Sequence, residues 1–455
     1  MDTKNDFTKG KILGPLLGFM APVFLALLLQ AMYGAVDLLI VGQFAESLDV
    51  SAVSTGSQMM MTITHLVTSF AMGTTILLGQ RIGAGRGKEG GEVVGSGICP
   101  FGTIAAVLTV LVPLLARPLS SVMNAPKEAF AATASYIRIC GLGSVFIIAY
   151  NLIGSIFRGI GDSKTPLMTV LIACVCNVAG DLLLVAVFHM GTAGAAIATV
   201  AAQALSVVLS LLILRRRELP FRFGREDLRF KRSVIKPMTT LGLPIALQDL
   251  LVGISFLVLL AIVNDLGLIP SAGVGVAERV CGFIMLIPSA FMQAMAAFVA
   301  QNIGAGKYDR AKKTLGYAVA VSTGLAVVMF AVTFWRGDLL SGIFSKDAAV
   351  IAASADYLRA YAIDCLLTCF LFCFIGYFNG LGLTRFVMVQ GIVGAFLVRI
   401  PVAFLMSREV PVSMFHIGLA TPCSTVLQVL LCLICFFWAN RRFSGSGSGK
   451  GSVLL

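Results

Sequence analysis

The sequence predicts an all-α integral membrane protein, with twelve transmembrane helices in two six-helix bundles that are related by a parallel internal repeat. Three observations lead to this fold class. The 455 residues are 58% hydrophobic and only 12% charged, whereas soluble domains carry about 25% charged residues. Apolar segments of roughly 20 residues, the length of a membrane-spanning helix, recur along the chain. Several stretches in the two halves also match each other at a constant spacing.

Hydropathy separates twelve candidate spans, six before the longest polar segment and six after it. Glycine and proline interrupt several of them, which membrane helices tolerate when neighbours satisfy the freed backbone groups. In chain order the predicted spans cover residues 13–41, 51–79, 93–115, 129–156, 165–188, 191–214, 237–263, 272–301, 312–335, 349–378, 384–406 and 412–439.

Charge predicts the orientation of these spans. If the N-terminus is cytoplasmic, the inner segments hold 25 Lys and Arg and the outer loops hold five. This bias follows the positive-inside rule, so both termini are expected in the cytoplasm of a multi-pass protein of the inner (plasma) membrane. The first residues, MDTKNDFTKGKILG, are short and basic and lack a signal-peptide cleavage site, so they are interpreted as a cytoplasmic lead-in.

The internal repeat has an offset of 221 residues. GQRIGAGRGKEGGEVVG at 79–95 matches AQNIGAGKYDRAKKTLG at 300–316, and FRGIGDSKTP at 157–166 matches FNGLGLTRFV at 378–387. Pro22 and Pro244 correspond within one residue of the same offset. Six spans per half give both halves the same orientation, which makes the repeat parallel.

The predicted organisation is an N-terminal six-helix lobe (1–214), a basic cytoplasmic linker loop (215–236), a C-terminal six-helix lobe (237–440) and a flexible Ser/Gly-rich tail (441–455). Two facing bundles suit a transporter that works by alternating access. The GAG turns lack the spacing and the hydroxyl of a nucleotide-binding P-loop. We therefore expect secondary, ion-driven transport rather than an enzyme activity.

Other partners and cofactors are not indicated. The eleven cysteines lie mostly in apolar runs, as expected of small buried side chains rather than a disulfide or metal framework. The net charge of +12 is concentrated in the inner loops, so it indicates the bilayer surface rather than nucleic acid. We expect a monomer that binds small amphiphilic or cationic molecules, with H⁺ or Na⁺ as the coupling ion and no organic cofactor.

Polar residues inside the spans of the first half form the candidate coupling site. A carboxylate in the bilayer core costs roughly 2.5 kcal/mol or more, so each one suggests a function. Asp37 lies on the first span, Asn177 and Asp181 lie four residues apart on one face of the fifth, and Thr199 lies on the sixth. Topology places both carboxylates at similar depth, within a few ångströms along the membrane normal.

Two close carboxylates in a low-dielectric site favour a shared proton or a bound monovalent cation, because both cannot comfortably be ionised. This is the chemistry that a proton- or sodium-coupled antiporter requires, and no other metal site is expected. The alternative is structural: Asp37 caps a helix end, and Asp181 bonds Asn177. Acids are absent at the repeat-equivalent positions of the second half, so the coupling site is assigned to the first.

The second half has its own intramembrane charges, and mutual neutralisation is the favoured interpretation. A wall that attracts cations is the alternative. The five candidate residues of this charge network are Asp249, Glu278, Arg279, Asp364 and Arg399.

The paired QRIGAGR and QNIGAGK stretches, the FRGIGDSKTP stretch and the duplicated twelve-helix plan resemble the multidrug and toxic compound extrusion (MATE) transporters over about residues 10–440. The chain is most similar to the DinF-like branch. That resemblance implies a cation site at Asp37, Asn177, Asp181 and Thr199. It also implies drug contacts at Gln30 and Tyr33, a cavity position at Asn151 and a flexible proline at Pro22.

The resemblance implies efflux of organic cations and amphiphilic drugs in exchange for H⁺ or Na⁺. The NorM-like branch instead places acids where this chain has Val252 and Thr368, with Asp249 and Asp364 one turn away. Two alternatives remain within the superfamily, a lipid-linked oligosaccharide flippase and an exporter of one metabolite. A channel or receptor is disfavoured by the duplication.

Overall fold

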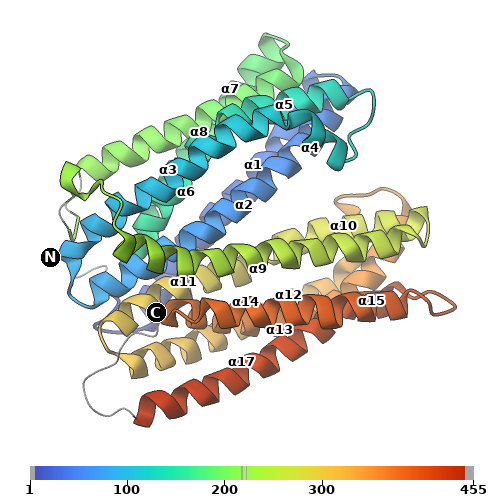
Figure 1. Ribbon diagram of the computed structural model, residues 1–455. Helices are drawn as coiled ribbons and strands as arrows, with labels where there is room; N and C mark the ends of the chain where they lie inside the picture. Colours follow the sequence, from blue (N-terminus) through green and yellow to red (C-terminus); the bar gives the residue numbers. More distant parts are fainter. Residues whose placement is uncertain (1–5, 217–218, 222, 446–455) are drawn as a thin grey trace. The chain divides into compact units, whose positions relative to one another are not determined.

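The computed structural model describes residues 6–216, 219–221 and 223–445, and every regular element in these ranges is helical (Figure 1). The elements are α1 (Leu13–Phe44), α2 (Ser47–Gly83), η2 (Gly87–Glu89), α3 (Gly90–Leu114), α4 (Ala116–Val122), α5 (Phe130–Leu142), α6 (Ser144–Gly159), α7 (Lys164–Asp181), η3 (Leu182–Val187), α8 (Gly191–Arg216), η4 (Arg225–Asp227), α9 (Arg232–Asn264), α10 (Leu268–Ile284), α11 (Leu286–Gly304), α12 (Tyr308–Gly342), α13 (Ala348–Leu381), α14 (Thr384–Val393), η5 (Gly394–Arg399), α15 (Ile400–Met406), α16 (Met414–Gly418) and α17 (Ala420–Gly445). Of the predicted tail, residues 446–455 lie outside the described ranges, as do linker residues 217, 218 and 222.

The helices confirm a multi-pass membrane protein. Within the described residues, eleven helical segments are long and apolar enough to cross a membrane, and one bent pair makes a twelfth. That pair, α5 and α6, replaces the continuous span predicted at 129–156, because the chain bends by 51° at Gly143. A Cβ at Gly143 would lie 2.6 Å from the Val200 side chain, so close packing requires glycine at the bend.

The repeat is visible in the ends of the helices. The second span of the first half, α2, begins at Ser47 and ends at Gly83, and its counterpart α10–α11 begins at Leu268 and ends at Gly304, an offset of 221 at both ends. The non-helical residue that separates α3 from α4 is Leu115, and its counterpart inside α12 is Arg336, with φ −127° and ψ 30°. The two halves therefore share the positions of their breaks as well as their helices.

Four glycines explain why the matching motifs are present in both halves. Gly85 and Gly306, which end the two GAG turns, both have φ +70°, and Gly161 and Gly382 have φ +86° and +85°. Each pair is 221 residues apart. A left-handed backbone costs other L-residues energy but not glycine, so these turns retain glycine in both halves.

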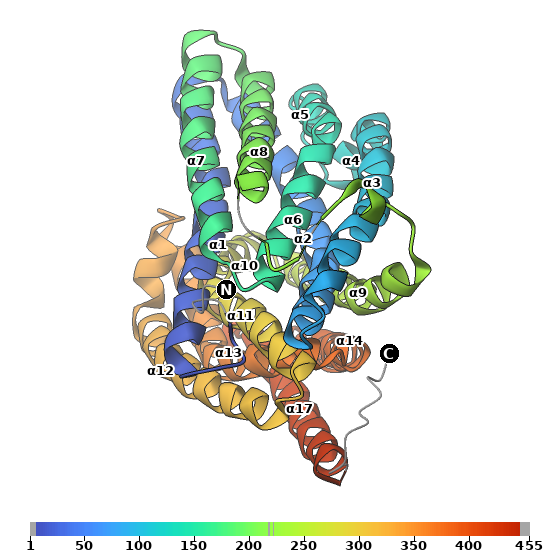
Figure 2. The same ribbon diagram turned by 90° about the vertical axis from the view of Figure 1, so that its left-hand side faces the viewer.

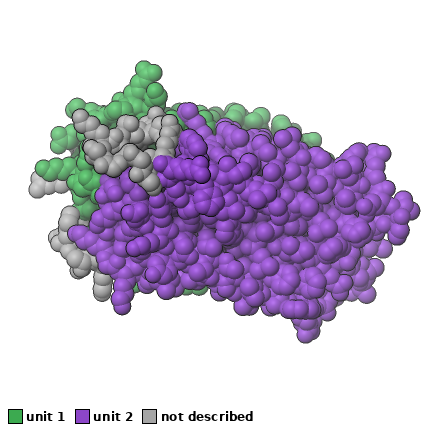
Figure 3. All heavy atoms as spheres, turned by 90° about the horizontal axis from the view of Figure 1, so that it is seen from below, with its two compact units in different colours: residues 1–6, 21–243 green, residues 7–20, 244–455 purple. Residues whose placement is uncertain are grey.

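The chain forms two compact units. Each unit contains the N-terminal part of the first helix that belongs, by sequence, to the other half of the repeat. Unit 1 comprises residues 1–6 and 21–243, and unit 2 comprises residues 7–20 and 244–455 (Figure 3). The boundaries fall inside α1, one residue before Pro22, and inside α9, at Pro244. The two repeat-equivalent prolines therefore mark the points where α1 and α9 pass from one unit to the other.

In unit 2 the leading segment begins with residues 7–12, here called the N-terminal arm. Phe7 is buried and stacks on Phe298, with the ring centroids 4.6 Å apart. The Arg310 guanidinium donates hydrogen bonds to the carbonyls of Phe7, Lys9, Gly10 and Lys11. These carbonyls precede a helix and have no helical partners of their own, so one side chain satisfies much of the arm's backbone.

In unit 1 the corresponding segment is the loop before α9 together with the first turns of that helix, up to residue 243. Ser96 Oγ donates to the carbonyl oxygen of Arg229 at 2.9 Å, and Lys231 Nζ lies 2.7 Å from Glu92 Oε1. A Cβ on Gly73 would lie 2.5 Å from the Met238 carbonyl oxygen, so α9 and α2 approach each other closely at that point.

Each unit has a central buried helix. In unit 2, α13 packs against α10, α11, α12 and α17. In unit 1, α2 packs against α5 and α6, while α7 and α8 lie side by side (Figure 2). A buried apolar cluster that includes Val41, Val53, Ile137 and Val185 holds the polar residues described next.

Candidate functional site

The structure brings the four residues of the predicted coupling site together inside unit 1. Asp37 comes from α1, Asn177 and Asp181 from α7, and Thr199 from α8. Asp37 is 2% exposed, and Asn177 and Asp181 are fully buried. Thr199 Oγ1 lies 3.2 Å from Asp37 Oδ2 and donates to it. The side chains of Asn177 and Asp181 also lie in the immediate environment of the Asp37 carboxyl.

The unsatisfied atoms of this cluster are its most informative feature. Among the described residues, Asp37 Oδ1, both carboxylate oxygens of Asp181 and both polar atoms of the Asn177 amide are buried without a hydrogen-bond partner. Buried polar groups are almost always paired, and an unpaired group costs about 1–3 kcal/mol. Several unpaired acceptors in one place fit bound protons or a monovalent cation.

Local helix geometry positions the fifth-span residues. Asn177 and Asp181 are one turn apart, so both side chains project from the same face of α7. Asp181 is the last α-helical residue, because the chain continues as the π-helical turn η3 from Leu182 to Val187. π-turns inside α-helices are frequent at functional sites, since they shift the register of the following side chains.

Sequence reasoning missed Tyr136 of α5, which belongs to the same neighbourhood. Its side chain is 2% exposed and lies close to Asp37, Cys140 and Thr199. Gly56 makes room for it, since a Cβ there would lie 2.5 Å from the Tyr136 ring. The signal was present in the repeat: the YIR of 136–138 matches the YLR of 357–359, and Tyr357 also lies beside an acid.

The predicted substrate-contacting residues occupy different environments. Gln30 is exposed, and its Nε2 donates to the Tyr150 hydroxyl at 3.2 Å. Tyr33 lies one turn before Asp37 and has a buried hydroxyl without a partner among the described residues. Asn151 is only 5% exposed. It accepts from Thr68 Oγ1 at 2.6 Å and donates to the Ile147 carbonyl.

Three of the five second-half charges, Arg399, Asp364 and Glu278, lie near one another in unit 2. Arg399 Nη1 donates to Ser255 Oγ at 2.8 Å, and its guanidinium lies 4.1 Å from the centre of the Phe256 ring. Asp364 and Glu278 act on Arg399 through their charges. Both acids also have polar neighbours: Thr368 Oγ1 donates to Asp364 at 2.7 Å, and the Tyr357 hydroxyl lies 3.5 Å from Glu278.

The structure does not bring the other two charges into that group. Asp249 and Arg279 are exposed at the surface of the unit. Within the described ranges, no ion pair within 4.0 Å joins Glu278, Arg279, Asp364 and Arg399 to one another. The charges around Arg399 therefore balance one another at longer range.

The first-half cluster has the types of ligand atom found in sites for small monovalent ions. Two carboxylates, an amide oxygen and a hydroxyl provide hard oxygen ligands of the kind that Na⁺ requires, and either carboxylate alone can take a proton. No group of three or more His, Cys, Asp or Glu side chains with metal-binding geometry occurs in the part of the chain that the structure describes.

Fold and site together define a class of protein: a polytopic membrane protein of two homologous helical lobes, one of which encloses a carboxylate pair. The MatE family model matches the chain twice, at residues 22–183 and 244–405. The chain therefore belongs to the MatE family. Both matches begin at the prolines that mark the unit boundaries.

Curated relatives and solved structures agree with this assignment. The chain is 24% identical to the probable multidrug resistance protein YoeA of Bacillus subtilis, over 94% of each chain. It is 23% identical to the multidrug export protein MepA of Staphylococcus saprophyticus, over 88% of each chain. A MOP superfamily transporter from Pyrococcus furiosus has the same fold, with a TM-score of 0.90 and 17% identity over 99% of this chain and 100% of that one.

Proposed function

We propose that this chain is a secondary active efflux antiporter that exports amphiphilic and cationic drugs in exchange for H⁺ or Na⁺. The unpaired atoms of Asp37, Asn177 and Asp181 carry the proposal. They form a buried cluster whose unpaired oxygens suit a proton or a monovalent cation. Export of multiple drugs is supported by the relatives named for multidrug resistance and multidrug export.

Coupling follows from differential binding. A ligand shifts a conformational equilibrium only by the difference in its affinity for the two states. A cation in the Asp37–Asp181 site neutralises buried charge and stabilises the state in which those side chains are closest together. If the exported drug binds better to the other state, each ligand promotes release of its counterpart, and the coupling is reciprocal.

The drug would contact Gln30 and Tyr33, which lie on the same face of α1 as Asp37. This arrangement places substrate and coupling ion on one helix. The Asn151 amide already accepts a hydrogen bond from Thr68 of α2. We therefore assign Asn151 a role in supporting the substrate site rather than in contacting the drug. The excess of Lys and Arg in alternate loops supports a cytoplasmic location for both termini in a plasma membrane.

The test is ethidium transport by the purified protein in proteoliposomes, with the proton and sodium gradients imposed independently. We expect transport to follow one gradient and to fall to the level of protein-free vesicles in Asp37→Asn and Asp181→Asn. Asp265→Asn is the matched control, because this exposed aspartate loses the same charge outside the site.

Two results would contradict the proposal. Transport that continues without either gradient would exclude an antiporter. Full coupling in both Asp37→Asn and Asp181→Asn, with expression equal to that of the control, would exclude this carboxylate pair as the coupling site.

A further inference from the structure

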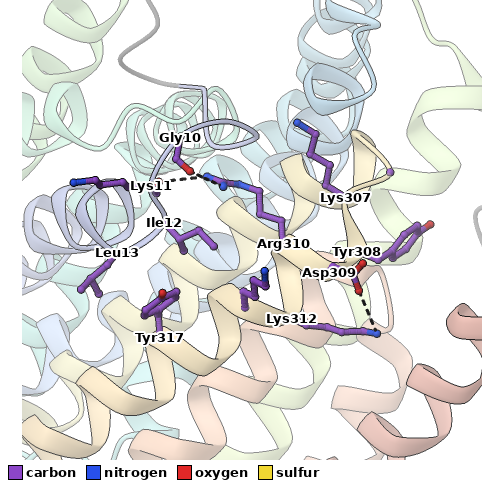
Figure 4. Close-up of a pocket in the computed structure, with 12 residues that line it drawn as sticks. Gly10, Lys11, Ile12, Leu13, Lys307, Tyr308, Asp309, Arg310, Lys312 and Tyr317 are labelled. Atoms are coloured by element: carbon purple, nitrogen blue, oxygen red, sulfur yellow. Dashed lines mark hydrogen bonds and ion pairs between the residues drawn. The ribbon is translucent and has the colours of Figure 1, made fainter.

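A basic hollow of about 940 Å³ lies in unit 2 where the N-terminal arm meets the start of α12 (Figure 4). Four lysines line it: Lys11 from the arm, Lys307 just before α12, and Lys312 and Lys313 on the first turns of that helix. Asp309 is the one acid in the lining. The hollow has no part in the coupling site of unit 1.

Most of this positive charge has no acidic partner. The ammonium groups of Lys11 and Lys313 make neither an ion pair nor a hydrogen bond within the described ranges, and Lys307 Nζ donates to the carbonyl oxygen of Thr8 at 2.8 Å. Lys312 Nζ lies 3.9 Å from Asp309 Oδ1, and the Asp309 side chain is 94% exposed. Three ammonium groups therefore line the hollow without a neutralising carboxylate.

The repeat offers an internal comparison. The counterparts of Arg310 and Lys313 in the first half are Glu89 and Glu92. There the charges are paired: Arg81 Nη1 lies 2.6 Å from Glu89, and Lys231 Nζ lies 2.7 Å from Glu92. Since unit 1 has an acid paired with a base at each of these two positions, the duplicated fold does not require bases there in unit 2.

The position of the hollow along the membrane normal follows from the two membrane-spanning helices that begin beside it. The spans α1 and α12 begin beside it, at Leu13 and Tyr308. The exposed side chains of Leu13 and Tyr317 border its apolar end. Tyrosines are enriched where membrane meets water, and juxtamembrane lysine clusters attract anionic lipids.

We propose that this hollow binds the phosphate of an anionic phospholipid headgroup in the leaflet where α1 and α12 begin. Lys11, Lys307 and Lys313 contact the phosphate, and the acyl chains lie along Leu13 and Tyr317. Because Lys11 belongs to the arm and the other two belong to the α12 end, the bound lipid would connect the two segments. A free phosphate ion shares the charge but has no acyl chains to use the apolar border.

The test is native mass spectrometry of the full-length protein in detergent, titrated with phosphatidylglycerol, with phosphatidylcholine and with inorganic phosphate. We expect the triple variant Lys11→Gln/Lys307→Gln/Lys313→Gln to bind phosphatidylglycerol at least about tenfold more weakly than the wild type. Phosphatidylcholine binding should not change. The corresponding arginine triple should retain binding, since it keeps the charge.

The matched control is Arg86→Gln/Lys88→Gln/Lys164→Gln, which removes the same charge from exposed positions of unit 1. It should bind phosphatidylglycerol like the wild type. Equal loss in the control, or unchanged binding in the lysine triple, would overturn the site. Inorganic phosphate that displaces phosphatidylglycerol at equal concentration would overturn the choice of a lipid as the ligand.

Discussion

Thr199 of α8 donates a hydrogen bond to Asp37 of α1, and the two residues are 162 positions apart in the sequence. This bond is the only one that the Asp37 carboxyl makes within the described ranges, because its second oxygen has no partner. Thr199 also donates to the Ala195 carbonyl one turn earlier, at 3.0 Å. A single hydroxyl hydrogen therefore has two competing acceptors, the Asp37 carboxyl and the Ala195 carbonyl.

The first prediction concerns this hydroxyl. Thr199→Ala removes the donor and should raise the coupling-ion concentration for half-maximal ethidium transport by about tenfold, equivalent to about 1.4 kcal/mol for a hydrogen bond to a charged group. Thr199→Ser keeps the hydroxyl and should remain within about twofold of the wild type. Equal behaviour of the alanine and serine variants would show that the methyl group matters and the hydrogen bond does not.

The second prediction concerns the prolines at the unit boundaries. Proline removes a backbone hydrogen bond to the carbonyl four residues earlier and so weakens a helix locally. Pro22→Ala and Pro244→Ala should each restore that bond and stiffen α1 or α9. We expect slower transport with unchanged ethidium affinity, measured by initial rates and by fluorescence titration. Pro100→Ala, inside α3 and away from a boundary, is the control, and an equal slowing there would refute a special role for the boundaries.

The third prediction concerns the charges of unit 2. Arg399→Met removes the cation near Asp364 and Glu278 and leaves the buried Asp364 and the half-buried Glu278 uncompensated, at a cost of about 3 kcal/mol. Thermal denaturation of the detergent-solubilised protein should begin several degrees lower than in the wild type. The double variant Arg399→Met/Asp364→Asn should recover part of the loss. Arg279→Met, at an exposed position, should melt like the wild type; a drop of the same size there would contradict the assignment.

The fourth prediction concerns the N-terminal arm. Arg310→Ala removes hydrogen bonds to four arm carbonyls, each of which contributes about 1 kcal/mol. Trypsin should then cleave after Lys9 and Lys11 at least about tenfold faster, as followed by mass spectrometry of the intact chain. Arg310→Lys should be intermediate, because an ammonium cannot donate in the fork geometry of a guanidinium. Cleavage at wild-type rate in the alanine variant would show that the arm is held by its other contacts, the Phe7 stack and the bonds from Asn302 and Lys307, without the guanidinium.

Much of the site could be predicted from local pattern. The spacing of Asn177 and Asp181 places both on one helical face, and topology places Asp37 at the same depth, so their proximity followed from helix periodicity and the membrane. Tyr136 was missed because a buried tyrosine in an apolar helix has no distinctive local pattern. Its position depends on the empty volume at Gly56, 80 residues away in sequence.

The fold also has features that local sequence pattern predicts and features that it does not. Hydropathy predicted the spans and the repeated motifs predicted the GAG turns, since both depend on residues close together in sequence. The left-handed backbone of the turn glycines became visible only in the structure. The bend at Gly143 depends on Val200, and the π-turn after Asp181 depends on packing against α8. The exchange of leading segments depends on partners almost 300 residues away, such as Asn302 Nδ2, which donates to the Phe7 carbonyl across 295 positions. Contacts between residues so far apart cannot be predicted from local sequence pattern.

That exchange has a consequence for biosynthesis. Phe298, Asn302 and Arg310 leave the ribosome roughly 15–60 s after Phe7 at a synthesis rate of about 5–20 residues per second. During that interval the leading turns of α1 must remain in the nascent chain without their final neighbours. The packing of unit 1 likewise cannot be completed until residues 228–243 have been synthesised. Each unit contains a segment from the other half of the sequence, so either half expressed alone, from a gene divided at the central loop, should be a substrate for membrane quality-control proteases.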